Sequence, residues 1–204
     1  MARTAGHKEA QLQALVDLAE QRIAAGGVAG LKARDLAAGL GCAVGAIYNL
    51  VDDIDALILL VRARTLARLD ALVAAALSGP AHEDPARAND EMVAVALAYC
   101  RFARSNLNLW RTMFEHRAGD RRLMPQTALA QQTQIFGHIM RPLRVKLPDA
   151  GEAALALLSR TLFAAVHGVT VISLDETLLE VPAAMLEAQV EQLVTLVARG
   201  LDAA

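Results

Sequence analysis

Apolar residues recur along this chain at intervals of three and four positions, the spacing that places them on one face of an α-helix. In the last predicted helix, for example, the apolar stripe is flanked by charged side chains. No stretch alternates apolar and polar residues in the manner of a half-buried strand. The chain is therefore predicted to be all-helical, with long helices at about 9–25, 53–77, 85–105, 125–143, 152–174 and 182–201. A short helix is predicted at about 106–116, and two more between 31 and 52.

Capping residues support several of these boundaries. Gly26 and Gly27 are expected to end the first helix, because glycine tolerates the left-handed backbone of a helix terminus. Asp84 followed by Pro85 is typical of a helix start. Asp149 and Glu152 are expected to form a capping box at the start of the helix at 152–174.

Residues 31–57 predict two short helices joined by a tight turn. One apolar stripe runs through both helices and comprises Leu36, Ala37, Leu40, Val44 and Ile47. Gly41 lies between them, where the absence of a Cβ permits a left-handed turn. A longer helix is expected to follow, because either Asp52 or Asp53 can cap its first turn. The stretch is thus predicted to be a helix-turn-helix.

Several residues of this stretch match a known pattern together: Leu31, Arg34-Asp35-Leu36-Ala37, Gly41, Gly45, Ile47-Tyr48, the acidic start of the next helix and Ala56-Leu57. In these residues the stretch resembles the DNA-binding segment of the TetR family of transcriptional regulators. The resemblance implies a helix that enters the major groove of DNA. The candidate DNA-binding residues are Lys32, Arg34, Ala43, Gly45, Ala46, Tyr48, Asn49 and Leu50.

The chemistry of these positions leaves two interpretations open. Asn49 can hydrogen-bond a base edge, whereas Ala46 and Leu50 can only touch a thymine methyl group. Ile54 stands where the family places a lysine that contacts phosphate. Residues 1–60 hold five basic residues against seven acidic ones, a balance of −2, although a DNA-binding domain usually carries a basic patch. The chain either binds DNA in a sequence-specific way or keeps the fold with weakened or lost DNA binding.

Six of the seven aromatic residues lie between residues 99 and 163. Aromatic residues at helical spacing often form plain core, but in helical bundles they also line ligand sites. The candidate ligand-binding residues are Tyr99, Phe102, Trp110, Met113, Phe114, Phe136, Met140, Phe163 and His167, with His116, His138 and Cys100 as further polar candidates.

Two segments of this half carry a second resemblance. Residues 108–114 (NLWRTMF) and Val166-His167-Gly168 resemble the ligand-binding domain of one branch of TetR regulators, a likeness that covers about residues 85–200. Gly168 is expected to let a neighbouring helix approach closely, because it carries no side chain.

Composition and charge narrow the class of protein. The chain has 20 basic and 22 acidic residues, which argues against a polybasic tail. Cys42 and Cys100 lie far apart, and with no visible signal peptide this favours a reduced, cytoplasmic protein. Residues 153–174 are almost wholly apolar but include Arg160. We therefore expect a helix buried on two sides in a soluble protein rather than a membrane span.

Enzymatic and metal chemistry are not expected. The sequence contains no glycine-rich phosphate loop, nucleophile elbow or paired carboxylates on an apolar face. No two histidines stand three or four residues apart, the spacing that places two metal ligands on one helical face. The prediction is therefore a protein without catalytic activity, metal or cofactor.

Together these observations predict a cytoplasmic, homodimeric transcriptional regulator, a repressor released from a palindromic DNA operator by a small molecule. The predicted division is a helix-turn-helix domain at 1–52, a linking helix at 53–77 and a ligand-binding and dimerisation domain at 78–204. The last two helices carry more apolar surface than one bundle can bury, and the equivalent helices form the dimer interface in the family. The alternative is a dimeric small-molecule-binding protein of the same fold without tight DNA binding.

Overall fold

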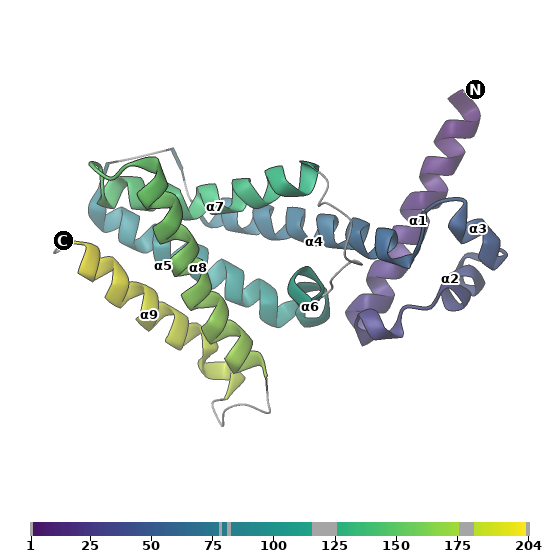
Figure 1. Ribbon diagram of the computed structural model, residues 1–204. Coiled ribbons are helices and arrows are strands. Elements are labelled where there is room, and N and C mark those ends of the chain that lie inside the picture. Colours follow the sequence, from purple (N-terminus) through teal and green to yellow (C-terminus); the bar gives the residue numbers. More distant parts are fainter. Residues whose placement is uncertain (1, 78, 81–82, 116–125, 176–181, 203–204) are drawn as a thin grey trace. The chain divides into compact units, whose positions relative to one another are not determined.

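The computed structural model describes residues 2–77, 79–80, 83–115, 126–175 and 182–202 (Figure 1). Their regular secondary structure is helical, which confirms the predicted fold class. The helices are α1 (Ala2–Gly26), α2 (Ala33–Leu40), α3 (Val44–Tyr48), α4 (Ile54–Ala76), α5 (Pro85–Ser105), α6 (Leu107–Glu115), α7 (Gln126–Lys146), α8 (Glu152–Leu174) and α9 (Leu186–Leu201), with 3-10 turns η1 (Val28–Gly30) and η2 (Ala183–Met185).

The chain folds into two compact units. The first comprises Met1–Ala67 with Asn106–Met124, and the second comprises Arg68–Ser105 with Pro125–Ala204. This division differs from the predicted boundaries at residues 52 and 78. Helix α4 contributes residues to both units, and α6 belongs to the first unit although the chain has by then passed through α5 of the second.

The core of the first unit joins α1, α2, α3, α4 and α6. In α1, Leu15, Ala19 and Ile23 recur at intervals of four residues and are fully buried. The helix-turn-helix packs Leu36, Ala37 and Ile47 onto that stripe, α4 adds Leu57, Ile58 and Val61, and α6 adds Leu109. These contacts fix α2 and α3 against a rigid support.

Three predicted helix ends are confirmed, and one is wrong. Gly41 adopts a left-handed φ of 66°, and its amide donates to two carbonyls of α2. Asp53 Oδ1 accepts from the amide of Ala56 at 2.7 Å, and Asp84 Oδ1 accepts from the amide of Ala86 at 2.9 Å. The predicted capping box at Asp149 and Glu152 does not form, because Gly151 precedes α8 and makes no side-chain cap.

Helix α6 joins the first unit through polar as well as apolar contacts. Asn108 Nδ2 donates to the carbonyl of Ala24 at 2.9 Å, which satisfies a backbone acceptor in the last turn of α1. Leu109, Trp110 and Met113 are buried. The sequence assigned this segment to the C-terminal domain because it follows α5 in the chain, but α1 is its packing partner.

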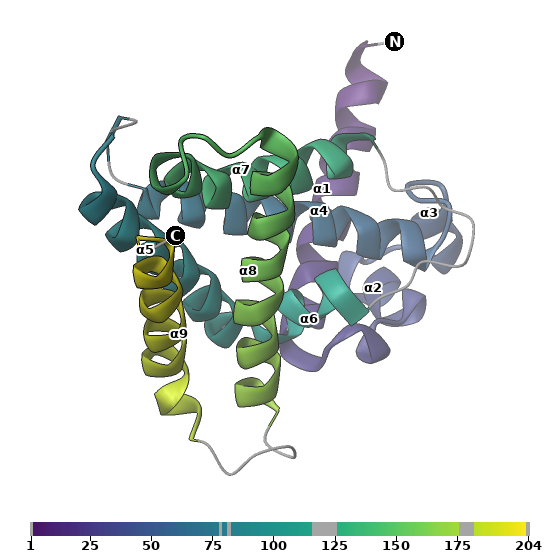
Figure 2. The ribbon, with the colours of Figure 1, turned by 60° about the vertical axis from the view of Figure 1, so that its left-hand side comes forward.

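The second unit is built around α5, which packs against α7, α8 and α9 (Figures 1 and 2). The C-terminal half of α4 belongs to the same unit. Two partly buried polar contacts tie its helices together. Arg141 on α7 donates to Glu91 Oε1 on α5 at 2.9 Å, and Lys146 at the end of α7 donates to Asp202, directly after α9.

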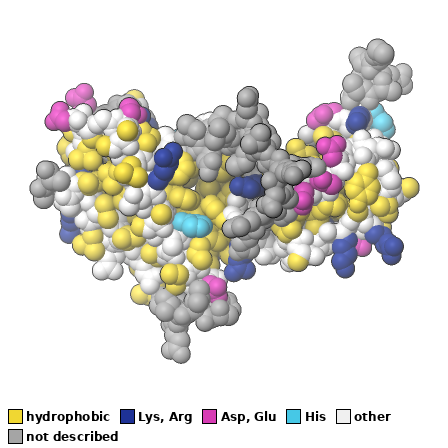
Figure 3. Space-filling view, in the orientation of Figure 1, with side chains coloured by type: hydrophobic (Ala, Val, Ile, Leu, Met, Phe, Trp, Pro, Cys, Tyr) yellow, Lys and Arg dark blue, Asp and Glu magenta, His cyan; other side chains and the backbone are white. Residues whose placement is uncertain are grey.

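Helix α8 is less buried than the sequence predicts. It is long and apolar enough to cross a membrane, yet only 22% of its most apolar stretch is buried. One face, with Leu155, Ser159, Val166 and Thr170, packs into the second unit. The expectation of burial on two sides is therefore wrong for the single chain. Apolar side chains spread over the face of the molecule on which α8 lies (Figure 3).

Candidate DNA-binding and ligand-binding sites

Helix α3 presents one face to solvent while its opposite face is buried. Ile47 is fully buried in the core of the first unit, so the orientation of this short helix is fixed. Tyr48 is 48% exposed and Val44 is 40% exposed, and Asn49, which caps the helix at its C-terminal end, is also exposed. The exposed face therefore offers a phenol and a carboxamide among small apolar groups.

The predicted DNA-binding residues fall mainly on the surface of this unit. Lys32 stands immediately before α2 and Arg34 in its first turn, and both are exposed. Ala43 and Gly45 are exposed as well, whereas Ala46 and Leu50 are half-buried. Leu50 packs against the core rather than standing clear of it.

The residue that replaces the family's lysine has a structural role here. Ile54 at the start of α4 is half-buried and packs against the core of the first unit. An ammonium group at this position would sit at an apolar margin, where an isoleucine side chain gains free energy by burial. Position 54 therefore supports the fold and offers no charge to a phosphate.

Part of the acidic excess in the first 60 residues is neutralised by an arginine further along the chain. Arg64 on α4 donates to Asp17 Oδ1 on α1, to Gln13 Oε1 at 2.8 Å and to Glu20 Oε2 at 3.3 Å. The hydrogen bond to Asp17 is the main cause that raises the pKa of the Arg64 guanidinium. Counted over residues 1–67, seven basic residues balance seven acidic ones.

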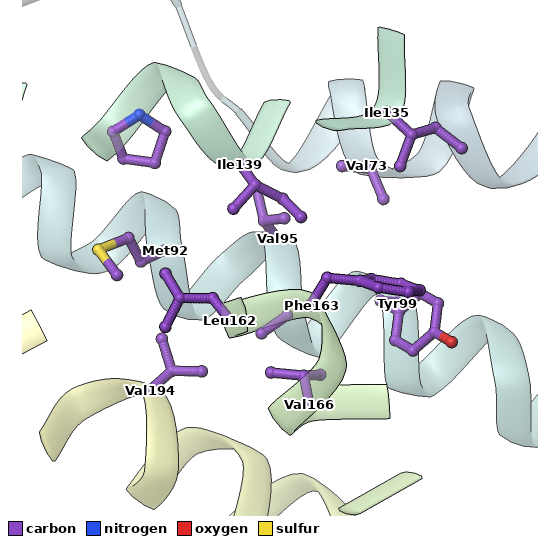
Figure 4. A pocket seen from close by; sticks show the side chains of 12 residues that line it. Val73, Met92, Val95, Tyr99, Ile135, Ile139, Leu162, Phe163, Val166 and Val194 are labelled. Atoms are coloured by element: carbon purple, nitrogen blue, oxygen red, sulfur yellow. The ribbon is translucent and has the colours of Figure 1, made fainter. Parts of the chain in front are cut away.

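The second unit contains an apolar cavity of about 60 Å³ (Figure 4). Its walls come from α4, α5, α7, α8 and α9 and consist of aliphatic and aromatic side chains with one methionine and one proline. The lining residues are Val73, Met92, Val95, Ala96, Tyr99, Ile135, Ile139, Pro142, Leu162, Phe163, Val166 and Val194.

A cluster of rings forms one wall of this cavity. Phe163 on α8 lies edge-to-face against Tyr99 on α5 and against Phe136 on α7, with centroids 5.5 Å apart in each pair. The same phenyl ring stacks on the imidazole of His167, again at 5.5 Å. These geometries are the favourable ones for aromatic pairs, so the cluster joins three helices at the cavity edge.

A hydrogen-bonded pair provides the polar group nearest to the apolar lining. Tyr99 Oη and His167 Nδ1 lie 2.7 Å apart. Burial lowers the pKa of His167 below its usual value, so the imidazole is neutral at pH 7 and carries one donor and one acceptor nitrogen. In the close-up the Tyr99 ring lines the cavity while its hydroxyl points away from Met92 and Val194 (Figure 4).

The structure divides the predicted ligand-binding residues. Tyr99 and Phe163 line the cavity, and Phe136 and His167 contact Phe163. Phe102 is buried in the second unit and Met140 is half-buried, but neither lines the cavity. The remaining three, Trp110, Met113 and Phe114, belong to the first unit, where Phe114 is 42% exposed.

The structure also locates three further residues that the sequence singled out, Cys100, His138 and Gly168. Cys100 is buried and His138 pairs with Asp70 at 2.9 Å, and neither of them lines the cavity. Gly168 does not serve a close helix contact, because a Cβ placed there would meet no atom within 4 Å. His116 lies outside the described residues.

Most of the cavity lining was not predicted. Ten of its residues are aliphatic, sulfur-containing or proline side chains at helical spacing, and the sequence carries no signal that separates them from ordinary core. Aromatic residues stand out because the chain has few of them. Nothing in the sequence distinguishes a valine that borders a cavity from a valine packed in the core.

The chain combines a helix-turn-helix unit with a helical bundle that contains an apolar cavity. These two features together define a class of proteins. Residues 92–197 match the family described as tetracyclin repressor-like, C-terminal domain. The chain therefore belongs to the TetR family of transcriptional regulators.

Solved structures with the same fold are distant in sequence. A protein of unknown function from Rhodococcus sp. RHA1 has 22% identity and a TM-score of 0.68, covering 93% of this chain and 92% of that chain. The TetR family transcriptional regulator PfmR from Thermus thermophilus has 17% identity and a TM-score of 0.57, covering 93% and 95%. No curated protein is significantly similar in sequence.

Proposed function

We propose that this protein is a soluble, cytoplasmic, homodimeric repressor that binds a palindromic DNA operator and releases it when a small molecule binds. The proposal rests mainly on α4, because this one helix contributes residues to both compact units. Leu57, Ile58 and Val61 belong to the core that supports the helix-turn-helix, and Val73 of the same helix lines the cavity.

The first part of the proposal is DNA binding by the exposed side of α2 and α3. Lys32 and Arg34 supply phosphate contacts, which give sequence-independent affinity. Asn49 and Tyr48 on α3 supply the polar groups that reach base edges in the major groove. The buried Ile47 supports this role, because a recognition helix must be held rigidly to read a sequence.

The second part is dimerisation through α8 and α9. Leu157 on α8 is 67% exposed and Leu196 on α9 is 61% exposed, and Val171 and Ile172 on α8 are also exposed. An apolar face of this kind on a soluble protein indicates a partner surface. A second copy that pairs α8 and α9 with their symmetry mates covers the face and places two copies of α3 in successive major grooves.

The third part is coupling between the ligand and the DNA. A molecule in the cavity pushes on Val73 and thereby on α4, whose other half supports α3. Small displacements of one shared rigid element are a common way for two sites to influence each other.

The test of DNA binding is selection of bound sequences from a random pool of duplex DNA by the purified full chain. We expect enrichment of one palindrome and affinity that falls steeply with salt. Lys32→Ala should weaken binding to all sequences and lower the salt slope by about 1, whereas Asn49→Ala should cost about 1–3 kcal/mol mainly through lost preference at one base position. Arg144→Ala, at an exposed position on α7 outside the elements proposed for DNA binding and dimerisation, is the matched control and should change neither.

Equally weak binding to every sequence would favour the second candidate, a dimeric small-molecule-binding protein without tight DNA binding. Specific observations support that candidate. Position 54 offers no charge to phosphate, Ala43 precedes α3 without a side-chain cap, and the exposed face of α3 carries few polar groups. The same selection experiment separates the two candidates.

A further inference from the structure

The first unit contains a cleft of about 340 Å³ between the end of α1 and one face of α6. Helix α6 lies beside the end of α1 in both ribbon views (Figures 1 and 2). All the residues that line the cleft belong to this one compact unit, and none of them lines the cavity of the second unit. They are Gly26, Gly27, Val28, Ala29, Asn108, Arg111 and Thr112.

The cleft has the size of a small-molecule site. Its volume of about 340 Å³ lies within the range of roughly 300–1,000 Å³ that is usual for ligand pockets. It is also about twice the roughly 150 Å³ of an apolar cavity known to hold benzene. The cavity of the second unit, at about 60 Å³, is well below that size. The cleft therefore accepts a molecule built on a single ring without being enlarged.

Two successive glycines help to leave this space open. Gly27 has a φ of 71°, which lets the chain turn directly from α1 into η1. A Cβ placed on Gly26 would meet no atom within 4 Å, and one placed on Gly27 would meet only Asn108 Oδ1, at 3.9 Å. The end of α1 therefore borders open space, and a side chain added at Gly26 can occupy it without a clash.

The polar groups of the cleft are held in place by hydrogen bonds to the backbone. Asn108 Nδ2 donates to the carbonyl of Ala24 at 2.9 Å. The Thr112 hydroxyl donates to the carbonyl of Asn108 at 2.7 Å, and Thr112 is buried. Side chains that are already fixed lose little conformational entropy when a ligand binds, so these groups form a preorganised wall.

The charge of the cleft favours an anion. Arg111 is the only charged residue among the described residues that line it, and its side chain is half-buried. A guanidinium matches the geometry of a carboxylate through two parallel N–H donors. Arg111 also interacts with another group, but its five N–H donors allow it to bind a ligand as well. Val28 and Ala29 add apolar surface for the rest of the molecule.

We propose that this cleft binds a small, single-ring carboxylate, with the carboxylate on Arg111 and the ring against Val28 and Ala29. Ala19 and Ile23 of α1, which precede the cleft by seven and three residues, belong to the core that supports α2 and α3. A ligand that contacts both α1 and α6 therefore stabilises the unit that carries the helix-turn-helix. The site is separate from the effector cavity of the proposed function, and its test does not involve DNA.

The first measurement is a titration of the ¹⁵N-labelled full chain, followed by NMR at the backbone amides of residues 26–29. Benzoate and benzamide share one ring and a similar shape, but only benzoate is charged. We expect saturable shifts with benzoate and binding about tenfold tighter than that of benzamide, the effect of one charge-assisted hydrogen bond. No saturable shift with benzoate, or equal binding of benzamide, would overturn the proposal.

Phenyl phosphate distinguishes a carboxylate site from a phosphate site, since arginine binds both groups. At pH 7 a phosphate monoester carries a charge of about −1.5 to −2, and the described lining supplies one cation. The additional charge has no partner there, so we expect phenyl phosphate to bind more weakly than benzoate. Tighter binding of phenyl phosphate would contradict the assignment to a carboxylate.

A pair of glycine variants places the ligand. Gly26→Phe fills the cleft and should weaken benzoate binding about tenfold or more, as expected when a pocket is occupied. Gly30→Phe is the matched control, because Gly30 is also exposed and free of close neighbours but does not line the cleft. Far-UV circular dichroism reports whether each variant folds. A folded Gly26→Phe that binds benzoate like the parent chain would show that the ligand lies elsewhere.

Arg111→Met tests the charged group and keeps a side chain of similar length. Benzoate binding should weaken about tenfold, the effect of one charge-assisted hydrogen bond, while benzamide binding should stay unchanged. Because the comparison is made within one variant, a general loss of structure would affect both molecules alike. An equal loss for both, or no loss for benzoate, contradicts the role of Arg111.

Discussion

The two cysteines lie in different surroundings. Cys42 lies exposed in the turn between α2 and α3, whereas Cys100 is fully buried on α5. Burial, aided by the nearby Glu187 carboxylate, raises the pKa of the Cys100 thiol to about 11. Because the thiolate is the reactive form, Cys100 carries almost none of it at pH 8.

We predict that the native protein reacts rapidly with 5,5′-dithiobis(2-nitrobenzoate) at one thiol per chain at pH 8. Cys42→Ser should abolish the fast phase, and Cys100→Ser should leave it unchanged. Unfolding in urea should expose the second thiol. Two fast-reacting thiols in the folded protein would show that Cys100 is accessible, contrary to its burial.

At the scale of the element, α7 carries two arginines one turn apart with different surroundings. Arg141 binds the Glu91 carboxylate, which is 5% exposed, and also donates to the carbonyls of Gly79 and Pro80 at 3.1 and 3.0 Å. Arg144 makes a bidentate pair with Glu152 at the surface, at 3.0 and 2.9 Å. Both pairs look alike in a sequence, but only the first is shielded from water.

We predict that Arg141→Met lowers the free energy of unfolding by about 3 kcal/mol, because it removes the hydrogen-bonded counter-charge of a buried carboxylate and leaves it only the more distant Arg87, 3.9 Å away. Arg144→Met, the matched control, should have little effect, since solvent screens an exposed pair. Urea denaturation measures both. Adding Glu91→Gln to Arg141→Met should recover part of the loss, and a double variant no more stable than the single one would contradict this explanation.

At the scale of the whole molecule, the exposed apolar face of α8 and α9 determines whether the protein works as one chain or two. Leu157 and Leu196 stand on this face and are more than half exposed. A membrane-spanning role would require burial in lipid of a helix that carries Arg160 near its middle, which is unfavourable. A second copy of the chain accounts for the same face without that cost.

We predict that the protein elutes as a dimer at micromolar concentration and that Leu157→Glu shifts it to the monomer, because the interface would bury an unpaired charge. Leu72→Glu changes a residue that is 50% exposed on α4 and should leave the dimer intact. Size-exclusion chromatography with light scattering distinguishes the two states. A monomeric parent chain would contradict the dimer.

The sequence predicted local features well, because they depend on residues a few positions apart. Apolar spacing located the helices, and Gly41, Asp53 and Asp84 marked ends that the structure confirms. Burial along the C-terminal half of α4 continues in a step of four residues from Leu69 to Val73, while Leu72 is 50% exposed. Val73 is the residue of α4 that lines the cavity.

By itself, then, the sequence determined the all-helical fold and the helix-turn-helix, and it carried the family resemblance, since these follow from short-range spacing and turn chemistry. Only the tertiary structure decided that α6 packs on α1, which aliphatic residues surround the cavity, and that α8 keeps an open face. The reason is that side chains distant in the chain must meet before a void or an uncovered surface exists, and their spacing along the chain does not specify which of them meet.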